Sequence, residues 1–416
     1  MQAIEEPRKL KFVFFRPHAN IWFKNPVRNI IRKRMLPNKY APLFDYAINS
    51  GAEIYLTTSL LPSTGVKGFI KSILEPIELL LWCLFNKISI SKVHFIFRKK
   101  SLCGKDILFM MHYDYGNFTY EAEDVAARGA KLAEYLSDIK IYKVVHMTHY
   151  AYNPAIGANN LRKLMPDLLV AESNLSANSS FFNKYFGDLK CNFYLLPYTP
   201  SPRFTKKTPF TDRVNKIVVT GSITFKMKGK EFLDFYGADE LQPLRRALYE
   251  AAGKYMDEMD CLISDLNASR VKPYKVDKQN IIQKIVKRLT YIHPQMNYYK
   301  RDIVATYNSY TMFAVPEEIC DLPAIGFIEG MACGCAFFGL DNPIYRDVGM
   351  IPNVHYVSYD GTVTGLMNKV RHYQANIGEL EQIAQHGYEF AVNQLNSKTV
   401  YKKFFDQLSA NLEAQA

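Results

Sequence analysis

The stretch TMFAVPEEICDLPAIGFIEGMACGCAFFGL, residues Thr311–Leu340, decides how the rest of this 416-residue chain is interpreted. Its first apolar run, Met312–Val315, ends at Pro316 and an acidic turn, which is typical of a buried strand that leads into a loop. Apolar residues at helical spacing follow, and then a second apolar run, Ala336–Leu340. Strand, acidic loop, helix and strand predict one unit of a parallel α/β sheet, with the loop at the ligand-binding edge.

Two carboxylates in this stretch can face the same crevice. Asp321 lies in the predicted loop, and Glu329 lies on the first turns of the predicted helix. The start of a helix offers free N–H groups and a positive dipole end to a phosphate. A nearby carboxylate is suited to accept hydrogen bonds from sugar hydroxyls. The pair therefore indicates a nucleotide sugar as ligand, whereas an amphipathic helix with a solvated Glu is the alternative for the acids alone.

The run Glu329-Gly330-Met331-Ala332-Cys333-Gly334 resembles the E-A-M-A-C-G signature of retaining glycosyltransferases of GT-B fold, the family-4-like group in particular. That group has a first Glu upstream, at the position of Asp321. The resemblance implies that Glu329 binds the ribose hydroxyls. It also implies that Asp321 acts at the transferred sugar, and that Ile325 and Gly326 contact the donor through their amides.

The chain departs from the family pattern at Leu322-Pro323-Ala324, where Gly-Phe-Gly is usual. Pro323 has no N–H to donate. Sugar recognition at this loop therefore differs from that of the family. This departure gives weight to a non-catalytic nucleotide- or glycan-binding protein as an alternative, and a nucleotide-sugar epimerase is a third possibility.

The length of the chain favours two α/β domains, each with its own core. The resemblance implies the GT-B fold, two Rossmann-like doubly wound domains with an interdomain cleft. We expect an acceptor-side domain over residues 1–205 and a nucleotide-sugar-binding domain over 206–385. The resemblance further implies that terminal helices over residues 386–416 cross back to the first domain.

Several polar side chains follow predicted strands of the first half. His18 comes after the run Lys11–Phe15, Asp114 after a strand near residue 110, and His146 and His149 close another strand. A lone strand-end His is usually structural, but several at neighbouring strand ends favour a site. We expect His146 to act at the reaction centre, and His18, Asp114 and His149 to contact the acceptor.

The second half opens on a β-branched strand, Lys216–Thr220, followed directly by Gly221 and Ser222. Glycine after such a strand lets a phosphate approach the backbone. Lys226 and Lys228 follow and can supply the cation that a leaving diphosphate needs, although a surface lysine run is the alternative. Arg16 and Arg245 are the next candidates for this contact.

The formal net charge of +12 favours an anionic partner. No helix-turn-helix, zinc-finger or RNP-type pattern is present, so nucleic acid is not expected. Anionic lipid fits the basic segment 28–39. The apolar stretch 70–90 is too interrupted by charges to span a bilayer. It can lie at a membrane interface with Trp82 as an anchor, or pack inside the first domain.

Seven scattered cysteines without metal-ligand spacing, and no cleavable signal, favour the cytoplasm, with peripheral attachment to the inner face of the plasma membrane as an option. No Asp-x-Asp occurs in the sequence, and neither a metal nor another cofactor is expected. The overall prediction is a hexosyltransferase-like enzyme that moves a sugar from a nucleotide-diphosphate donor to a glycan or glycolipid, with retention, in bacterial surface polysaccharide biosynthesis.

Overall fold

The computed structural model describes residues 9–15, 41–57, 60, 73, 76–77, 79–80, 83–84, 88–111, 123–223, 227, 230–265 and 301–415. The chain forms two compact units, the first comprising Met1–Leu196 and Ser397–Ala416, and the second Pro197–Asn396. The boundary predicted at residue 205 thus lies inside unit 2, where Asn308 donates to the carbonyl of Thr205 at 3.1 Å. Residue 386, where we predicted that the chain returns to the first domain, lies within the helix Ile377–Asn393 of unit 2. The chain rejoins unit 1 at Ser397.

Unit 1 is built on a parallel sheet with the strand order β3-β2-β1-β4-β5-β6-β7 among the described residues. Chain order reverses at β1, so the crossover helices cover both faces of the sheet. The strands are β1 Lys11–Phe15, β2 Glu53–Thr57, β3 Val93–Phe95, β4 Ile107–Met110, β5 Tyr142–His146, β6 Leu168–Ala171 and β7 Asn192–Leu195.

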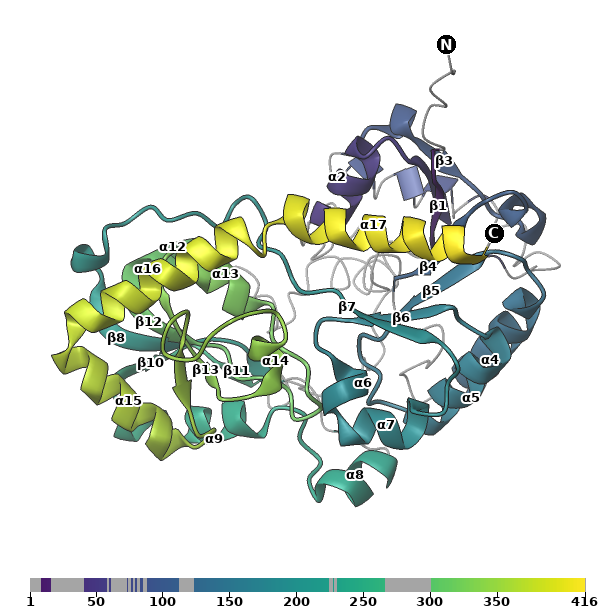
Figure 1. The fold of residues 1–416 in the computed structure, drawn as a ribbon. Coiled ribbons are helices and arrows are strands. Elements are labelled where there is room, and N and C mark those ends of the chain that lie inside the picture. Colours follow the sequence, from purple (N-terminus) through teal and green to yellow (C-terminus); the bar gives the residue numbers. More distant parts are fainter. Residues whose placement is uncertain are drawn as a thin grey trace, which may run out of the picture. The chain divides into compact units, whose positions relative to one another are not determined.

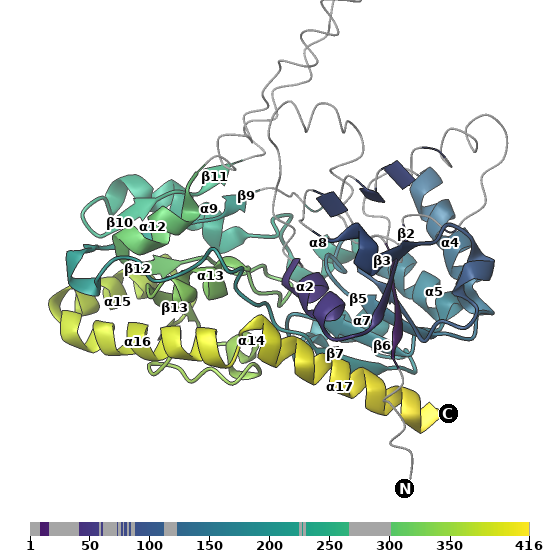
Figure 2. The same ribbon diagram turned by 90° about the horizontal axis from the view of Figure 1, so that it is seen from above.

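The described helices of unit 1 are α2 Ala41–Asn49, α4 Glu123–Ser137, α5 Pro154–Leu164, α6 Leu175–Asn178, α7 Ser180–Phe186 and α17 Ser397–Gln415, with short 3-10 turns at Ile90–Lys92 and Lys99–Leu102. Figures 1 and 2 show α2 and α17 on one face of the sheet and α4 and α5 on the other. Phe405 of α17 stacks on Phe12 of β1 with ring centroids 5.3 Å apart. Helix α17 is therefore an integral part of the core of unit 1.

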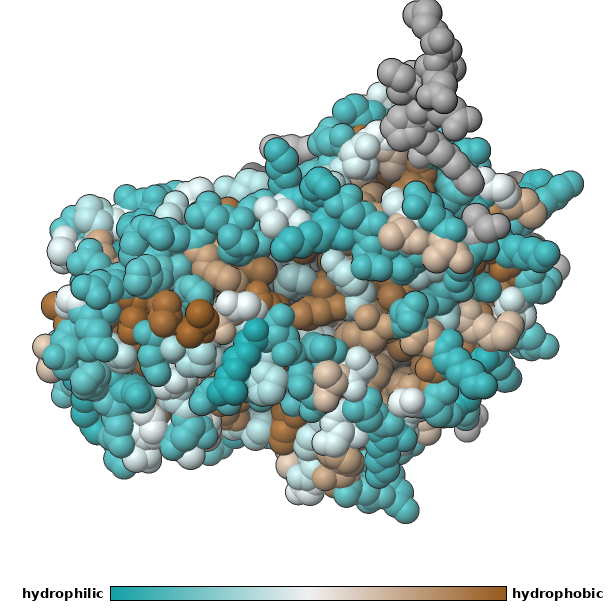
Figure 3. Space-filling view, in the orientation of Figure 1, coloured by the Kyte–Doolittle hydropathy of each residue, from teal (hydrophilic) through white to brown (hydrophobic). Residues whose placement is uncertain are grey.

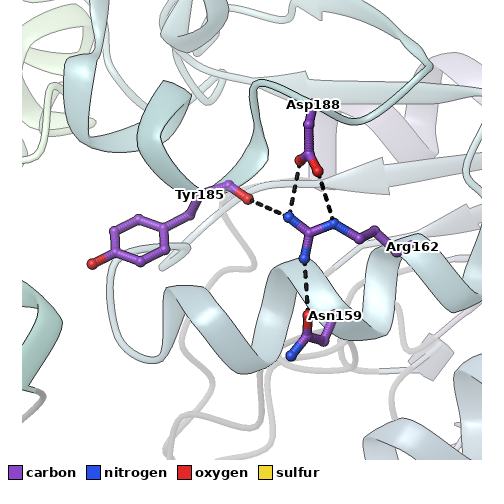
Figure 4. A network of polar contacts seen from close by, with 4 residues as sticks. All are labelled: Asn159, Arg162, Tyr185 and Asp188. Atoms are coloured by element: carbon purple, nitrogen blue, oxygen red, sulfur yellow. Dashed lines mark hydrogen bonds and ion pairs between the residues drawn. The ribbon is translucent and has the colours of Figure 1, made fainter.

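Arg162 joins α5 to the segment after α7 (Figure 4). Its Nε and Nη2 donate to the two carboxylate oxygens of Asp188 at 3.0 and 2.9 Å, and Nη2 also donates to the carbonyl of Tyr185. Its Nη1 donates to Asn159 at 2.9 Å. This bidentate pair lowers the pKa of Asp188. The contact fixes the segment that leads into β7.

Unit 2 has a parallel sheet with the order β10-β8-β12-β13-β14, and a small pair formed by β9 and β11. The strands are β8 Val214–Val219, β9 Ser222–Ile223, β10 Met259–Cys261, β11 Ser264–Asp265, β12 Tyr310–Ala314, β13 Ala336–Leu340 and β14 Val357–Tyr359. The helices are α8 Lys230–Tyr236, α9 Pro243–Ala251, α12 Ile303–Ser309, α13 Gly326–Ala332, α14 Pro343–Arg346, α15 Val363–Ala375 and α16 Ile377–Asn393, with 3-10 turns at Phe210–Asp212 and Ala252–Lys254.

The unit predicted from Thr311–Leu340 is confirmed as β12, a loop, α13 and β13. Gly334, at φ 70°, ends α13 in the left-handed conformation that favours glycine. Its N–H donates to Met331 O, and the N–H of Cys335 reaches Gly330 O, which together form a Schellman cap. The Cys-Gly end of the signature thus has a backbone role, and it turns the chain directly into β13.

Gly330 lies where α13 packs on β12, and this packing yields a stability prediction. A Cβ at Gly330 would lie 2.3 Å from the buried ring of Phe313, which cannot move away. Gly330→Ala is expected to lower the free energy of unfolding by about 1–3 kcal/mol, measured by urea denaturation. Gly378→Ala, also in a helix but with open space around it, is the control and should be neutral or slightly stabilising. Equal stability of the two variants would contradict the packing described.

Among the described residues, no helix is long and apolar enough to cross a membrane. All seven cysteines are free thiols. Figure 3 shows hydrophobic side chains on the surface of unit 2 beside α16, and Ile351 and Val354, in the loop before β14, are 54% and 38% exposed.

Candidate functional site

The reversal of strand order in unit 2 lies between β8 and β12. From β8 the chain moves to β10 on one side, and later returns to β12 on the other side. Loops that leave the carboxyl ends of two such strands diverge, which opens a crevice for ligands. Gly221 follows β8 and Pro316 follows β12, so both lie at this point. The site is therefore sought in these two loops and in α13.

Arg245 ties the two loops together. This α9 residue is 7% exposed; its Nε donates to Pro316 O at 2.8 Å, and its Nη1 donates to Ser222 O at 3.0 Å. The side chain lies against Gly221, where a Cβ would stand 3.2 Å from Cδ and Nε. Gly221 has φ 132°, which also favours glycine. Nη2 has no hydrogen-bond partner within the described ranges, so one edge of the guanidinium is left for an anion.

The loop after β12 is a tight turn that carries Asp321. The N–H of Glu318 donates to Leu322 O at 3.2 Å, and the N–H of Ile319 donates to Leu241 O, just before α9. Asp321 is half-buried and adopts φ 62°, a left-handed conformation that Asp tolerates better than most residues. The loop is thus held beside α9 by the bond from Ile319 to Leu241 and by the bond from Arg245 to Pro316.

Glu329 of α13 presents a half-buried carboxylate. The carboxylate oxygens accept no hydrogen bond from any residue in the described part of the chain. Burial raises its pKa to about 7, while the neighbouring Arg203 lowers it. Burial without hydrogen-bond donors favours the protonated form of a carboxylate. A hydroxyl group or a cation that contacts it stabilises the ionised form. Sequence reasoning identified Glu329 but missed Arg203, whose position after the Pro-rich segment carries no motif.

Two features fix α13 in place. Gly326 lets the helix start close to β12, because a Cβ there would lie 2.8 Å from Tyr307 Oη and 2.9 Å from Val315. At the other end, the buried Arg213 donates to Cys333 O at 2.9 Å and Gly334 O at 3.0 Å. Gly326 therefore has a packing reason besides the donor contact predicted for it. Ile325 immediately precedes the helix as its N-cap.

Glu317 adds a buried acid beneath this edge. It is 5% exposed and accepts from Tyr345 Oη and, at 3.4 Å, from the N–H of Leu340. Burial raises its pKa. Among the described residues, its second oxygen and the hydroxyls of Tyr356 and Tyr359 are buried without partners. Glu317 therefore connects the start of the loop after β12 to β13. In the sequence, the only indication of this residue is its place in the turn Pro316-Glu317-Glu318.

In unit 1, His146 and Glu172 form a buried pair at adjacent strand ends. His146 Nε2 lies 3.6 Å from Glu172 Oε1, and the side chains are 1% and 2% exposed. Thr148 donates through its N–H to His146 Nδ1 and through its hydroxyl to Glu172 Oε1, both at 3.3 Å. Because Nδ1 accepts, the ring proton belongs on Nε2, toward the carboxylate. The sequence indicated His146 but not Glu172 or Thr148.

The remaining predicted residues fall into two groups. His149 is half-buried, has φ 61° and packs edge-on to Tyr152, with ring centroids 5.6 Å apart. This backbone conformation is uncommon for a non-glycine residue and is enriched at functional sites. His18, Asp114, Lys226, Lys228 and Arg16 lie outside the described residues, as do Trp82 and the basic segment 28–39.

A surface pocket of about 290 Å³ lies elsewhere in unit 2. Its lining includes Val354, His355 and Phe390. His355 precedes β14, so the pocket lies toward the amino ends of the strands, opposite the crevice at Gly221 and Pro316. It is therefore separate from the candidate site.

Comparison with known proteins identifies the fold. No protein-family model matches the sequence, and no curated protein sequence matches it. Solved structures do match along nearly the whole chain. Anabaena HepE in complex with UDP-glucose has a TM-score of 0.54 at 12% identity, over 96% of this chain and 100% of that one. Sucrose-phosphate synthase from Thermosynechococcus elongatus has a TM-score of 0.53 at 11% identity, over 98% and 100%.

A glycosyltransferase from Rickettsia africae has a TM-score of 0.53 at 11% identity, over 98% of this chain and 99% of that one. These proteins share the GT-B architecture of two Rossmann-like domains. At such low identity the likeness concerns the fold alone. The chain therefore has the GT-B fold, as the resemblance of the Glu329–Gly334 run implied.

Proposed function

We propose that the chain is a glycosyltransferase that uses a nucleotide-diphosphate sugar, and that its donor site is the crevice between β8 and β12. The observation that carries the proposal is Glu329, a half-buried carboxylate without a hydrogen-bond partner among the described residues, on a helix at the ligand-binding edge of the sheet. Such a group fits the vicinal hydroxyls of a ribose. The GT-B fold supports the same assignment. UDP-sugars are the first donors to test, since HepE was solved with UDP-glucose.

In this proposal, each residue of the crevice contacts a different part of the nucleotide sugar. Glu329 holds the ribose, and Gly221 lets the diphosphate approach the backbone. Arg245, with Lys226 and Lys228, meets the charge of the diphosphate. Asp321 contacts the transferred sugar, together with the amides at Ile325 and Gly326. The carbonyl of Ser222 accepts a hydrogen bond from Arg245. Its side-chain hydroxyl therefore contacts the donor.

The reaction follows from these placements. The bond between the anomeric carbon and the diphosphate oxygen breaks, and the acceptor hydroxyl forms the new bond. Negative charge develops on the leaving oxygen, where Arg245 and the two lysines stabilise it. With retention, the acceptor approaches on the face that the leaving group departs from, so the departing oxygen itself receives the proton. In this scheme the half-buried His149 of unit 1 contacts the acceptor. His146 is 1% exposed, with its ring nitrogens toward Thr148 and Glu172, and has a structural role.

The proposal extends to a glycan or glycolipid acceptor in bacterial surface polysaccharide biosynthesis and to a cytoplasmic location. A panel of nucleotide sugars, assayed for nucleotide release with and without acceptor, tests the function. Acceptor-dependent release of nucleotide with a new glycosidic bond is expected. Binding without turnover would instead identify a non-catalytic protein, and a rearranged sugar nucleotide without acceptor would identify an epimerase. The anomeric configuration of the product, measured by NMR, tests retention.

A further inference from the structure

The surface pocket beside α16 has a lining that suits a small ligand. It measures about 290 Å³, near the lower limit of ligand pockets at about 300 Å³. On one side it is lined by His386, Glu389, Phe390 and Asn393 of α16. Their spacing of three, one and three residues places them on one face of the helix. Other residues of α16 belong to the core of unit 2, so the helix that carries this face is fixed.

The loop before β14, on the other side of the pocket, is fixed by its own hydrogen bonds. The N–H of Ile351 donates to His355 Nδ1 at 2.9 Å, and the N–H of His355 donates to Ile351 O at 2.9 Å. Asn353 has φ 58°, and its N–H donates to Tyr356 O at 2.7 Å. The loop approaches α16 closely, since a Cβ at Gly387 would lie 2.5 Å from His355 O. The pocket is therefore preformed, which lowers the ordering cost of binding.

Two aromatic rings lie side by side in the lining. His355 and Phe390 have ring centroids 4.6 Å apart at an interplanar angle of 33°, and both side chains are partly exposed. The negative face of an aromatic ring attracts the C–H groups of a sugar ring. Because His355 Nδ1 accepts from Ile351, the proton of the neutral imidazole is on Nε2, which is a donor. Burial and the nearby His386 lower the pKa of His355, which favours this neutral form.

The polar groups of the lining indicate a neutral ligand with many hydroxyls. Glu389 accepts from Gln385 at 2.7 Å and has capacity for further donors, and the amides of Asn393 and Gln394 both donate and accept. The described residues that line the pocket include no Lys or Arg. The carboxyl end of α16 adds a negative dipole end, which disfavours a phosphate or another anion.

The described part of the chain also offers no group of three or more His, Cys, Asp or Glu that could hold a metal ion. A saccharide fits the remaining chemistry. Its hydroxyls both donate and accept hydrogen bonds, and the C–H face of its ring is apolar. Rings beside planar polar side chains match both properties.

We propose that the pocket lined by His355, Glu389 and Phe390 binds a sugar unit of a glycan. The C–H face of the sugar lies on the two rings, and its hydroxyls bond to Glu389, to Nε2–H of His355 and to the amides at the end of α16. The pocket lies toward the amino ends of the strands, away from the crevice at Gly221 and Pro316, so it holds a glycan without taking part in transfer. The inference does not depend on the proposed donor site, because it concerns other residues and is tested without a nucleotide sugar.

Saturation-transfer NMR of the full chain with maltotriose, cellotriose, chitotriose and mannotriose tests the proposal, because this method detects weak binding. At least one of these oligosaccharides is expected to bind. His386→Ala combined with Glu389→Ala should weaken its binding about tenfold or more. The matched control, His372→Ala combined with Glu381→Ala, removes the same two kinds of exposed side chain outside the pocket and should bind as the parent does.

A second variant tests the aromatic contact. Phe390→Leu keeps an apolar side chain but loses the ring face, and it should also weaken binding about tenfold. Urea denaturation of each variant checks that it is folded. Glu329→Gln should bind the oligosaccharide as the parent does, and saturating UDP should not displace it.

A parent chain that binds none of the four oligosaccharides, or pocket variants that bind as well as the parent, would overturn the proposal. Displacement of the oligosaccharide by UDP would overturn it too, because the sugar would then lie in the donor crevice. A parent dimer in sedimentation velocity that Phe390→Leu abolishes, without oligosaccharide binding, would instead assign the pocket to self-association.

Discussion

Arg245→Met is expected to lower turnover by about a hundredfold or more, the scale observed when one donor to a developing negative charge is lost. Arg245 lies at the crevice with Nη2 directed to no described protein group, while Nε and Nη1 hold Pro316 O and Ser222 O. The variant loses both the charge and the link between the two loops. Because an anion interaction that grows in the transition state affects turnover, the loss should appear mainly in kcat rather than in the affinity for donor.

A structural role alone would predict a different outcome, so two further measurements accompany this variant. Added guanidinium ion should restore part of the turnover of Arg245→Met if the missing charge limits the reaction. Arg371→Met, an exposed arginine of α15 that pairs with Glu258 at 2.8 Å, should keep parental turnover. If Arg245→Met is folded and turns over normally, the diphosphate contact belongs to other residues, with Lys226 and Lys228 the first to examine.

Glu329→Gln should make the protein more stable at alkaline pH. The pKa of Glu329 in the folded chain, about 7, exceeds its ordinary value of 4.5. Between these values the folded chain holds a proton that the unfolded chain has released, so stability from this group is full below about pH 4.5 and is lost as the pH rises through 7. Gln remains neutral. The variant should therefore exceed the parent by about 1–3 kcal/mol at pH 8 and match it near pH 4.

The same substitution should weaken nucleotide binding. Loss of a charge-assisted bond to the ribose costs about 1.5–3 kcal/mol, or about ten- to a hundredfold in Kd. Affinity of the parent should also fall about tenfold from pH 8 to pH 6 as Glu329 becomes protonated, and the variant should lose this dependence. Isothermal titration at both pH values measures it. Glu381→Gln, on the exposed side of α16, is the control; unchanged affinity in Glu329→Gln would remove Glu329 from the nucleotide site.

The order of elements was predictable because the local signals are strong. The apolar run Ala336–Leu340 coincides with β13, and the run Lys11–Phe15 coincides with β1. Boundaries between units were less predictable, since they depend on which core a segment joins. Thr205 contacts Asn308, which is 103 residues away in the sequence. A local sequence pattern cannot predict such a contact.

The candidate site was predictable in its acids and less so in its supports. Glu329 and Asp321 stand in a motif whose spacing can be read directly. Arg245 binds one carbonyl 23 residues away and another 71 residues away, so its role depends on tertiary structure. The pairing of His146 with Glu172 has the same origin, because it joins two strand ends that are neighbours only in the sheet.

Helix α17 has a consequence for how the chain is made. Unit 2 is continuous in sequence, whereas unit 1 needs Tyr401, Phe404 and Phe405 to close its core against β1 and α2. A ribosome synthesises all of Pro197–Asn396 before these aromatic residues. During translation, unit 2 can therefore complete its fold first, and the sheet of unit 1 keeps an uncovered aromatic face until α17 emerges.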